Sequence, residues 1–339
     1  MNFDWKNIGF GYIRTDYNLR TYYKDGKWGE LEVTSSEHIN IHMAATSLHY
    51  GQEAFEGLKA YMGKDGKIRI FRWEENAKRM HSSAKGIKMA EVPEKLFHDA
   101  IVRAVQLNKK YIPPYGTGAT LYIRPLLIGT GAEVGVKSGK EFLFLVFVTP
   151  VGPYFKEGFK PVTIMICRDY DRAATLGTGN IKVGGNYAAS LASLEIAHNK
   201  GYSTALYLDA KEKIYLDECG PANFFGIKGN IYVTPASHSI LPSVTNKSLQ
   251  ELALDMGMKV EKRKIPVEEL AEFEETGACG TAAIISPIGK IVDVDKDISY
   301  TYCKDGKPGP ISTKLYERLV AIQFGEEKDK FGWMEEVEA

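Results

Sequence analysis

The sequence predicts an α+β protein of two domains, and two observations support that class. Strand-like and helix-like stretches are mixed in both halves of the chain, and the second half contains antiparallel hairpins. The 339 residues, at roughly 150 per domain, suffice for two hydrophobic cores. We expect a small N-terminal domain at 1–150, an interdomain loop at 151–161 rich in proline and glycine, and a larger C-terminal domain at 162–339.

The N-terminal elements follow from hydrophobic periodicity. Ile68–Phe71 is typical of a short strand, and Pro93–Lys110 carries apolar residues at helical spacing. Ala119–Gly129 and Glu141–Thr149 are long apolar runs, rich in the β-branched and aromatic residues that strands favour. The segment between them, Gly129–Gly139, is predicted to be a loop.

The C-terminal elements are shorter. We expect a strand at Val162–Tyr170 and a helix at Asn186–Lys200 whose inward residues include Leu191. A helix at Lys247–Met256 would begin with a capping box, Ser248 followed three residues later by Glu251. Two hairpins are predicted, formed by 205–208 with 214–216 and by 224–227 with 231–234.

Composition narrows the possible functions. The 43 basic and 43 acidic side chains give a net charge of 43 − 43 = 0, so nucleic acid and anionic membranes are not expected partners. The four cysteines are Cys167, Cys219, Cys279 and Cys303, and they form no C-x-x-C pair, which argues against a zinc site or a disulfide framework. No signal peptide and no apolar span is visible. We therefore expect a cytoplasmic protein.

Glycines surround one lysine in an unusual segment. Residues 177–187 read GTGNIKVGGNY, with Lys182 framed by four glycines just before a predicted helix. Because glycine accepts backbone conformations that other residues avoid, a planar ligand could approach Lys182 closely. The segment could equally be a flexible surface loop with a solvated lysine. It matches neither G-x-x-x-x-G-K-[ST] nor G-x-G-x-x-G, which disfavours a nucleotide loop.

Two further segments in the second half carry candidate ligand groups. In ECGPANFF, Glu218 ends one predicted strand and Asn223 opens the next, although an acid in that position is often simply exposed. In PSVT, Thr245 lies just before a predicted helix, where free N–H groups and the helix dipole favour phosphate. Thr245 could also serve only as the N-cap.

A third segment, Gly280–Ala283, is a predicted turn of small residues, GTAA. Such a turn can serve packing alone, or it can present backbone N–H groups to a carboxylate.

The first half offers a carboxylate-binding pair. In LYIRP, Tyr122 and Arg124 lie two residues apart and therefore on one face of a strand, where a hydroxyl and a guanidinium can hold a carboxylate. An ordinary edge-strand arginine is the alternative. Arg79 lies four residues after Glu75, so a surface ion pair is its simplest interpretation.

Together these motifs resemble the branched-chain amino acid aminotransferases, pyridoxal phosphate enzymes of fold type IV. HYG-x-x-x-FEG, YIRP, K-x-GGNY, E-x-G-x-x-N-x-F and GTAA occur in the family's order and spacing, and the likeness runs nearly end to end. The resemblance implies a small N-terminal α/β domain and a larger domain with a pseudo-barrel of strands surrounded by helices. It also implies pyridoxal 5'-phosphate as cofactor and at least a homodimer, to which the Gly129–Gly139 loop is a candidate contributor.

The resemblance also implies roles for individual residues. Lys182 would hold the cofactor covalently, Tyr187 would donate to its phenolic oxygen and Glu218 would face its ring nitrogen. The phosphate would be held by Arg79, Thr281 and the backbone of Val244 and Thr245. The substrate residues would be Tyr50, Phe55, Tyr122, Arg124, Tyr154, Thr281 and Ala282.

Those residue types suit transamination between leucine, isoleucine or valine and 2-oxoglutarate, in a ping-pong cycle. A protonated ring nitrogen opposite Glu218 strengthens the cofactor as an electron sink, and the free amine of Lys182 can move the proton. An aromatic pocket suits a branched side chain, while Arg124 suits the second carboxylate of glutamate.

The sequence departs from the family at the phosphate turn. It reads Ser243-Val244-Thr245-Asn246, where relatives usually have glycine at the first position and a basic residue at the last, and Tyr232 replaces a usual aliphatic residue. The redox C-x-x-C that mammalian relatives carry after the GTA turn is absent. D-amino acid aminotransferases and 4-amino-4-deoxychorismate lyases share the lysine and the glutamate, but FEG-x-K-x-Y and YIRP favour the branched-chain enzymes. A phosphate-ligand binding protein without catalysis is the alternative outside this fold.

Overall fold

The computed structural model describes residues 3–5, 7–153, 158–303 and 305–338, and its contacts divide the chain into two compact units. Unit 1 comprises Met1–Lys156, Ile181–Gly184 and Ala321–Ala339, and unit 2 comprises Glu157–Asn180 and Gly185–Val320. Two segments of the expected C-terminal domain, Ile181–Gly184 and Ala321–Ala339, belong to unit 1 instead. Ile181–Gly184 contains Lys182, and the C-terminal segment ends in a strand, Met334–Val337, that pairs with Ile68–Phe71 of unit 1.

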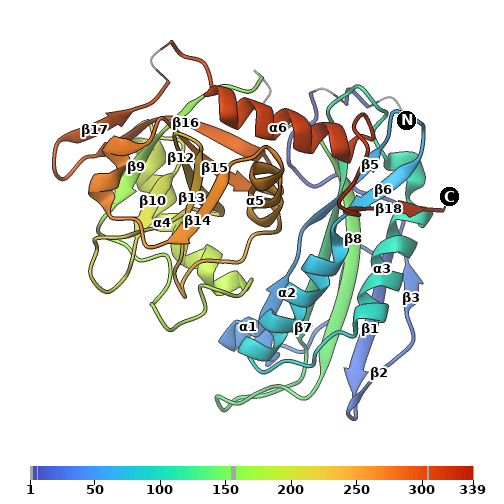
Figure 1. Ribbon diagram of the computed structural model, residues 1–339. Coiled ribbons are helices and arrows are strands. Elements are labelled where there is room, and N and C mark those ends of the chain that lie inside the picture. Colours follow the sequence, from blue (N-terminus) through green and yellow to red (C-terminus); the bar gives the residue numbers. More distant parts are fainter. Residues whose placement is uncertain (1–2, 6, 154–157, 304, 339) are drawn as a thin grey trace. The chain divides into compact units, whose positions relative to one another are not determined.

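Unit 1 is built on an antiparallel sheet (Figure 1). Its strand order is β18-β6-β5-β7-β8-β1-β2, with β3 paired to β1 and β4 paired to β7. The strands are β1 (Asn18–Lys24), β2 (Lys27–Trp28), β3 (Glu32–Thr34), β4 (Glu53–Phe55), β5 (Leu58–Met62), β6 (Ile68–Phe71), β7 (Thr120–Gly129), β8 (Phe142–Val151) and β18 (Met334–Val337). The predicted strand at 68–71 and the two long apolar strands are confirmed. Because β7 lies between β5 and β8, Arg124 is not on an edge strand, and that interpretation was wrong.

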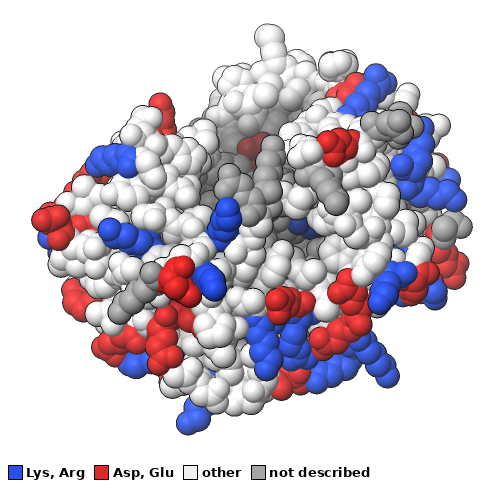
Figure 2. Space-filling model, turned by 90° about the horizontal axis from the view of Figure 1, so that it is seen from above, with Lys and Arg blue, Asp and Glu red and all other residues white. Residues whose placement is uncertain are grey.

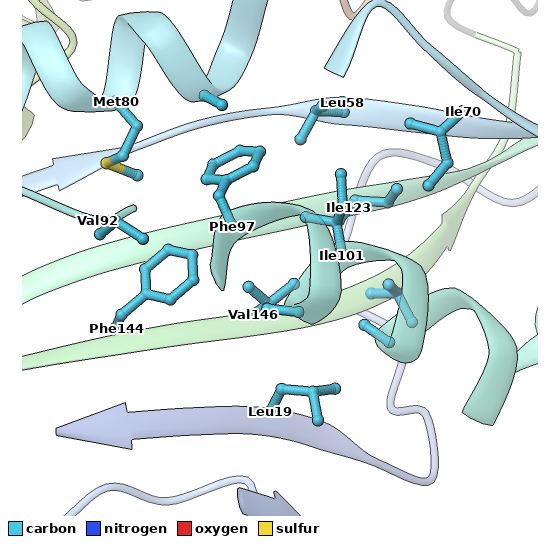
Figure 3. Close-up of a cluster of buried hydrophobic side chains, with 14 of the residues drawn as sticks. Leu19, Leu58, Ile70, Met80, Val92, Phe97, Ile101, Ile123, Phe144 and Val146 are labelled. Atoms are coloured by element: carbon cyan, nitrogen blue, oxygen red, sulfur yellow. The ribbon is translucent and has the colours of Figure 1, made fainter. Parts of the chain in front are cut away.

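Helices supply the other side of the unit 1 core. They are α1 (Thr46–Tyr50), α2 (Trp73–Gly86), α3 (Glu94–Leu107) and the 3-10 turn η1 (Lys109–Tyr111). Phe97 and Ile101 of α3 pack against Phe144 and Val146 of β8, as Figure 3 shows, and all four are fully buried. The helix predicted to reach Lys110 ends at Leu107 and continues as η1.

Unit 2 contains a closed ring of strands. Among the described residues, β11 pairs with β10, β10 with β9, β9 with β16, β16 with β15, β15 with β12, and β12 again with β11. The strands are β9 (Val162–Cys167), β10 (Ala205–Leu208), β11 (Leu216–Cys219), β12 (Ala222–Lys228), β13 (Ile231–Pro235), β14 (Lys259–Arg263), β15 (Glu275–Gly280), β16 (Ile284–Asp293) and β17 (Ile298–Thr301). Apolar side chains such as Ile164, Leu206, Phe224 and Ile288 fill its core. The predicted pseudo-barrel and the α+β class are confirmed.

Helices α4 (Gly184–Asn199), α5 (Val244–Asp255), η2 (Val267–Glu272) and α6 (Pro310–Gln323) accompany this barrel (Figure 1). In α4 the buried positions are Asn186, Ser193 and Ala197, whereas Leu191 is 63% exposed, so the inward placement of Leu191 was wrong. Small residues face inward because α4 carries only weak apolar periodicity.

Two local predictions fail because side chains compete for backbone N–H groups. The Asp209 carboxylate accepts hydrogen bonds from the N–H groups of Ile214 and Tyr215, so β11 begins at Leu216 rather than at 214. Helix α5 begins at Val244, and its N-cap is Ser243, whose hydroxyl accepts from the Asn246 N–H. Ser248 instead donates to the Val244 carbonyl, so the capping box was wrong.

Charges of both signs are interspersed over the surface in Figure 2, consistent with the balanced composition. Within the described ranges, no helix is long and apolar enough to cross a membrane. Those ranges also contain no group of three or more histidine, cysteine, aspartate or glutamate residues that could hold a metal ion.

Candidate active site

The backbone around Lys182 is fixed on both sides within unit 1. The Lys182 N–H donates to the Ser83 hydroxyl of α2 at 2.8 Å, and the Lys182 carbonyl accepts from the Phe55 N–H at 3.1 Å. The next residue, Val183, forms a β-bridge with Ala54. Lys182 is therefore not a solvated residue of a flexible loop, and that alternative is wrong.

Helix α2 presents a second functional group on the same face as Ser83. Arg79 lies one turn before Ser83, and its guanidinium grips Glu56 through Nε at 2.7 Å and Nη2 at 2.8 Å. Both side chains are buried, and Asn76 also donates to Glu56. The partner of Arg79 is thus a buried carboxylate from the FEG motif rather than a surface pair with Glu75. Glu56 was missed because nothing in its sequence position distinguishes it from an ordinary strand-end acid.

Aromatic rings and two cations form the rest of this group. The Lys182 Nζ lies 4.5 Å from the centroid of the Phe55 ring, and the Arg124 guanidinium carbon lies 4.9 Å from the same ring. The Arg124 Nη2 donates to the Tyr122 hydroxyl at 3.1 Å, which confirms that the two side chains share a face of β7. We call Lys182, Phe55, Tyr122, Arg124 and Arg79 the lysine cluster.

The FEG glycine is required by this packing. A Cβ atom on Gly57 would lie 2.0 Å from the Tyr122 hydroxyl oxygen, so any side chain there would displace the tyrosine. The Arg124 Nε is buried and has no hydrogen-bond partner among the described residues. The lysine cluster therefore has a hydrogen-bond donor that a ligand could use.

The hydrogen bond of the Tyr50 side chain goes to a different segment from that of the Tyr122–Arg124 pair. Its side chain is 38% exposed at the end of α1, and its hydroxyl donates to the Val134 carbonyl in the Gly129–Gly139 loop. Tyr154 lies outside the described residues.

Glu218 of β11 is fully buried in unit 2, so the prediction of a plain exposed acid was wrong. Its Oε1 accepts from the Leu241 N–H and lies 3.2 Å from Nη2 of Arg172. Its Oε2 accepts from Asn223 Nδ2 at 3.0 Å. Burial raises the pKa of the Glu218 carboxyl to about 7, while Arg172, the Leu241 N–H and Asn223 oppose that rise.

A chain of hydrogen bonds extends from Asn223 to Asn246 and Tyr232. Asn223 Oδ1 accepts from Asn246 Nδ2 at 3.1 Å, and Asn246 Oδ1 accepts from the Tyr232 hydroxyl at 2.9 Å. We call Glu218, Arg172, Asn223, Asn246 and Tyr232 the acid cluster. No sequence signal pointed to Arg172, which follows a predicted strand as an isolated basic residue.

The phosphate-turn residues occupy the start of α5. Val244 and Thr245 are buried and take its first two positions, where N–H groups have no partner within the helix. Thr245 is therefore not the N-cap, a role that belongs to Ser243.

The GTAA turn joins β15 to β16. Thr281 and Ala282 lie in the turn, and Ile284 directly after it has a φ of 66°. A β-branched residue rarely adopts this left-handed conformation, so the hairpin stores local strain next to the predicted ligand groups.

Each unit by itself contains groups of the kind that pyridoxal 5'-phosphate binds. Unit 1 contains the anchored amine of Lys182, and unit 2 contains the buried acid Glu218, the helix start at Val244 and the phenol of Tyr187 on α4. Together with the barrel topology, these groups define an aminotransferase of fold type IV.

Comparison with known proteins gives the family. The model of the family amino-transferase class IV matches residues 53–291. The chain therefore belongs to this family, whose cofactor is pyridoxal 5'-phosphate. The chain is 47% identical to the branched-chain-amino-acid aminotransferase of Haemophilus influenzae, over 99% of each chain.

Solved structures agree with this assignment. The fold is similar to that of the branched-chain amino acid aminotransferase of Escherichia coli, with a TM-score of 0.81 and 26% identity over 96% of this chain and 100% of that one. It is also similar to the branched-chain aminotransferase of the archaeon Thermoproteus uzoniensis with norvaline, with a TM-score of 0.76 and 25% identity over 94% of this chain and 100% of that one. Another similar branched-chain enzyme was solved with pyridoxamine 5'-phosphate, the aminated form of the cofactor.

Proposed function

We propose that this protein is a branched-chain amino acid aminotransferase, which moves the amino group between L-leucine, L-isoleucine or L-valine and 2-oxoglutarate in a ping-pong cycle. The observation that carries this proposal is the 47% identity to a branched-chain enzyme over 99% of the chain.

Lys182 is the catalytic residue in this proposal. It would hold the cofactor covalently and, once released by substrate, move a proton between the α-carbon and C4′ of the cofactor. Its backbone anchors to Ser83 and Phe55 support this role, because they fix the point from which the side chain swings.

Glu218 would pair with the ring nitrogen, with Tyr187 on the phenolic oxygen. When bound, the cofactor delocalises the electron pair left at the α-carbon, and a protonated ring nitrogen deepens that delocalisation. The hydrogen bonds from Asn223 and Leu241 support a charged Glu218 against the cost of its burial.

The phosphate would be held by Arg79, Thr281 and the backbone of Val244 and Thr245. Glu56 supports this assignment because it fixes the Arg79 side chain in one rotamer and leaves the guanidinium pre-oriented. The helix start at Val244 favours an anion.

The substrate side chain would lie against Phe55, Tyr50 and Tyr154. Tyr122 and the backbone of Thr281 and Ala282 would take the α-carboxylate, and Arg124 with Tyr50 would take the second carboxylate of glutamate. The Nε of Arg124 has no partner in the described part of the chain, which supports this use, since a buried donor without a partner costs free energy that a carboxylate would recover.

Borohydride reduction followed by peptide mapping tests the proposal. A pyridoxyl group is expected on Lys182 and on no other lysine. A group on a different lysine, or no covalent group at all, would overturn the enzyme assignment and favour a binding protein.

Two other activities of the same fold are distinguished by substrate. D-amino acid aminotransferases would act on D-leucine, and 4-amino-4-deoxychorismate lyases on aminodeoxychorismate. We expect turnover of L-leucine with 2-oxoglutarate, and no turnover of the other two substrates.

We also propose a cytoplasmic homodimer. Exposed apolar side chains gather near the Gly129–Gly139 loop, where Val134 is 87% and Val136 is 88% exposed, and Met43 and Leu48 are exposed close by in the chain segment that bonds to this loop. Such a patch is typical of a protein interface. Light scattering on the purified protein should give twice the 37.8 kDa chain mass or a higher multiple.

A further inference from the structure

Tyr232 and Asn246, two buried polar side chains of unit 2, are hydrogen-bonded to each other. The Tyr232 hydroxyl donates to Asn246 Oδ1 at 2.9 Å, and both side chains are almost wholly inaccessible to solvent. They come from different elements, β13 and α5. Because a buried polar group that lacks a partner costs free energy, each of these two side chains depends on the other.

Thr234 fixes which way the Asn246 amide points. The Thr234 hydroxyl gives its proton to the Phe224 carbonyl at 2.8 Å, so towards Asn246 it can only accept. Asn246 Nδ2 therefore faces Thr234, at 2.9 Å, and Oδ1 faces the tyrosine. Gln250 Nε2, at 3.2 Å from the same Oδ1, agrees with this orientation.

The orientation of the Asn246 amide also determines the orientation of the Asn223 amide. Asn246 Nδ2 also donates to Asn223 Oδ1 at 3.1 Å, which leaves Asn223 Nδ2 to donate to Glu218 Oε2 and to the Leu241 carbonyl. If the Asn223 amide turned over, its carbonyl oxygen would face the carboxylate of Glu218. The donors and acceptors therefore match in only one sense along the whole chain.

We propose that Tyr232 and Asn246 are positioning residues that, through Asn223, keep an N–H donor turned toward the carboxylate of Glu218. This inference rests on the proposed function, in which Glu218 serves the ring nitrogen of the cofactor. We call the hydrogen-bonded series Tyr232, Asn246, Asn223 the relay. The Tyr232 hydroxyl holds the end of the relay that is farthest from Glu218.

The relay matters because Glu218 is poorly placed to stay charged. Burial works against its charged form, as does Asp217, while Arg172 and the Leu241 N–H favour it. The thiols of Cys219 and Cys279 also lie close enough to interact with it. Since Oε1 is held by Arg172 and Leu241, the donor from Asn223 is what stabilises charge on Oε2.

Two substitutions test the relay in the holoenzyme. Tyr232→Phe removes only the anchoring hydroxyl, and Asn246→Leu removes the middle of the relay. Tyr302→Phe is the matched control, because its half-buried hydroxyl donates to the Leu270 carbonyl and has no part in the relay. The protonation of Glu218 is followed by pH-difference infrared spectroscopy, with its band assigned by its loss in Glu218→Gln.

The expected result is a rise in the pKa of Glu218, by about half a unit in Tyr232→Phe and about one unit in Asn246→Leu. The acid limb of the kcat profile with leucine should move to higher pH by the same amount, and kcat on that limb should fall about three- to tenfold with KM unchanged. Tyr302→Phe should show neither change.

The results distinguish a failure of the relay from a failure of the proposed role of Glu218. If Glu218→Gln slows turnover but both relay variants keep the wild-type Glu218 band and acid limb, the relay is refuted and the proposed function stands. The relay is equally refuted if Tyr302→Phe shifts the profile as far as Tyr232→Phe does. If Glu218→Gln leaves turnover unchanged, the role of Glu218 itself fails.

Discussion

The lysine cluster and the acid cluster differ in how completely their polar groups are paired. In the acid cluster, both oxygens of Glu218 and both amide groups of Asn223 and Asn246 have partners. In the lysine cluster, Arg124 keeps a buried Nε without a partner among the described residues.

This difference matches what the two clusters would do. A group that only stabilises charge works best when it is fixed beforehand, since no reorganisation is then needed during reaction. Groups that release one partner and bind another cannot be fully paired at rest. We therefore expect substitutions in the lysine cluster to change which ligands bind or react, and substitutions in the acid cluster to change rate and pH dependence.

The largest effect is expected for Lys182→Ala. Removing the amine removes both the covalent attachment and the proton-moving base, so kcat should fall by about a thousandfold or more. The protein should still bind the cofactor, because the residues that would bind its phosphate remain. The absorbance of the protein after gel filtration measures how much cofactor stays bound. Lys200→Ala, at an exposed position after α4, is the control. Substantial turnover by Lys182→Ala would contradict the role of this lysine.

Arg79→Met should have the next largest effect. It leaves Glu56 buried without its cation, and breaking such a pair costs about 3–5 kcal/mol in the free energy of unfolding. Urea unfolding measures the loss. Arg263→Met, which breaks partly exposed pairs with Glu261 and Glu269, should cost much less.

A double variant sharpens this test. Arg79→Met with Glu56→Met replaces both charges by apolar side chains and should recover most of the stability. It should not recover cofactor affinity, measured by fluorescence titration of the cofactor-free protein. Recovery of both would mean that Arg79 serves the fold alone and has no part in holding phosphate.

Glu218→Gln tests the acid cluster. A charge-assisted hydrogen bond contributes about 1.5–3 kcal/mol, so proton abstraction should slow by roughly one to two orders of magnitude. The measurement is single-turnover absorbance of the bound cofactor after mixing with leucine. An unchanged rate would remove Glu218 from the mechanism.

The same variant has a pH signature in the cofactor-free protein. The pKa of Glu218 is raised from 4.5 to about 7, so its neutral form is favoured in the folded state. Its stabilising contribution is complete below pH 4.5 and is lost as the pH rises to 7, by about 3 kcal/mol. The stability of wild type relative to Glu218→Gln should fall over this window and stay constant above it. A flat difference would mean that Glu218 is not buried in solution.

The sequence predicted most of what local pattern determines. Period-two and helical spacing located β6, β7 and α3, and the pairing of Tyr122 with Arg124 followed from strand alternation. The failures involve residues that had a plausible neighbour in sequence but bond to a different group. Arg79 pairs with the distant Glu56, and Ser248 donates to a carbonyl within its own helix. The N–H of Ile214 is taken by the Asp209 carboxylate in the preceding turn.

The supporting residues of both clusters were invisible for the same reason. Glu56 meets Arg79 across 23 positions, and Tyr232 reaches Glu218 only through residues of α5 and β12. The sequence around Tyr232 gives no sign of its partner. Only the three-dimensional packing shows that its hydroxyl is bonded to Asn246.

The most selective effect is expected for Arg124→Ala. Its guanidinium would bind the second carboxylate of glutamate, so kcat/KM for glutamate should fall about ten- to a hundredfold. Leucine should lose less, because only the packing of Arg124 over Phe55 and Tyr122 is removed. Steady-state kinetics with both amino acids measures the ratio, and Arg124→Lys, which keeps the charge but not the planar fork, should give an intermediate value. Equal losses for both substrates would show that Arg124 shapes the pocket without choosing between them, and the unpaired Nε would then need a different ligand.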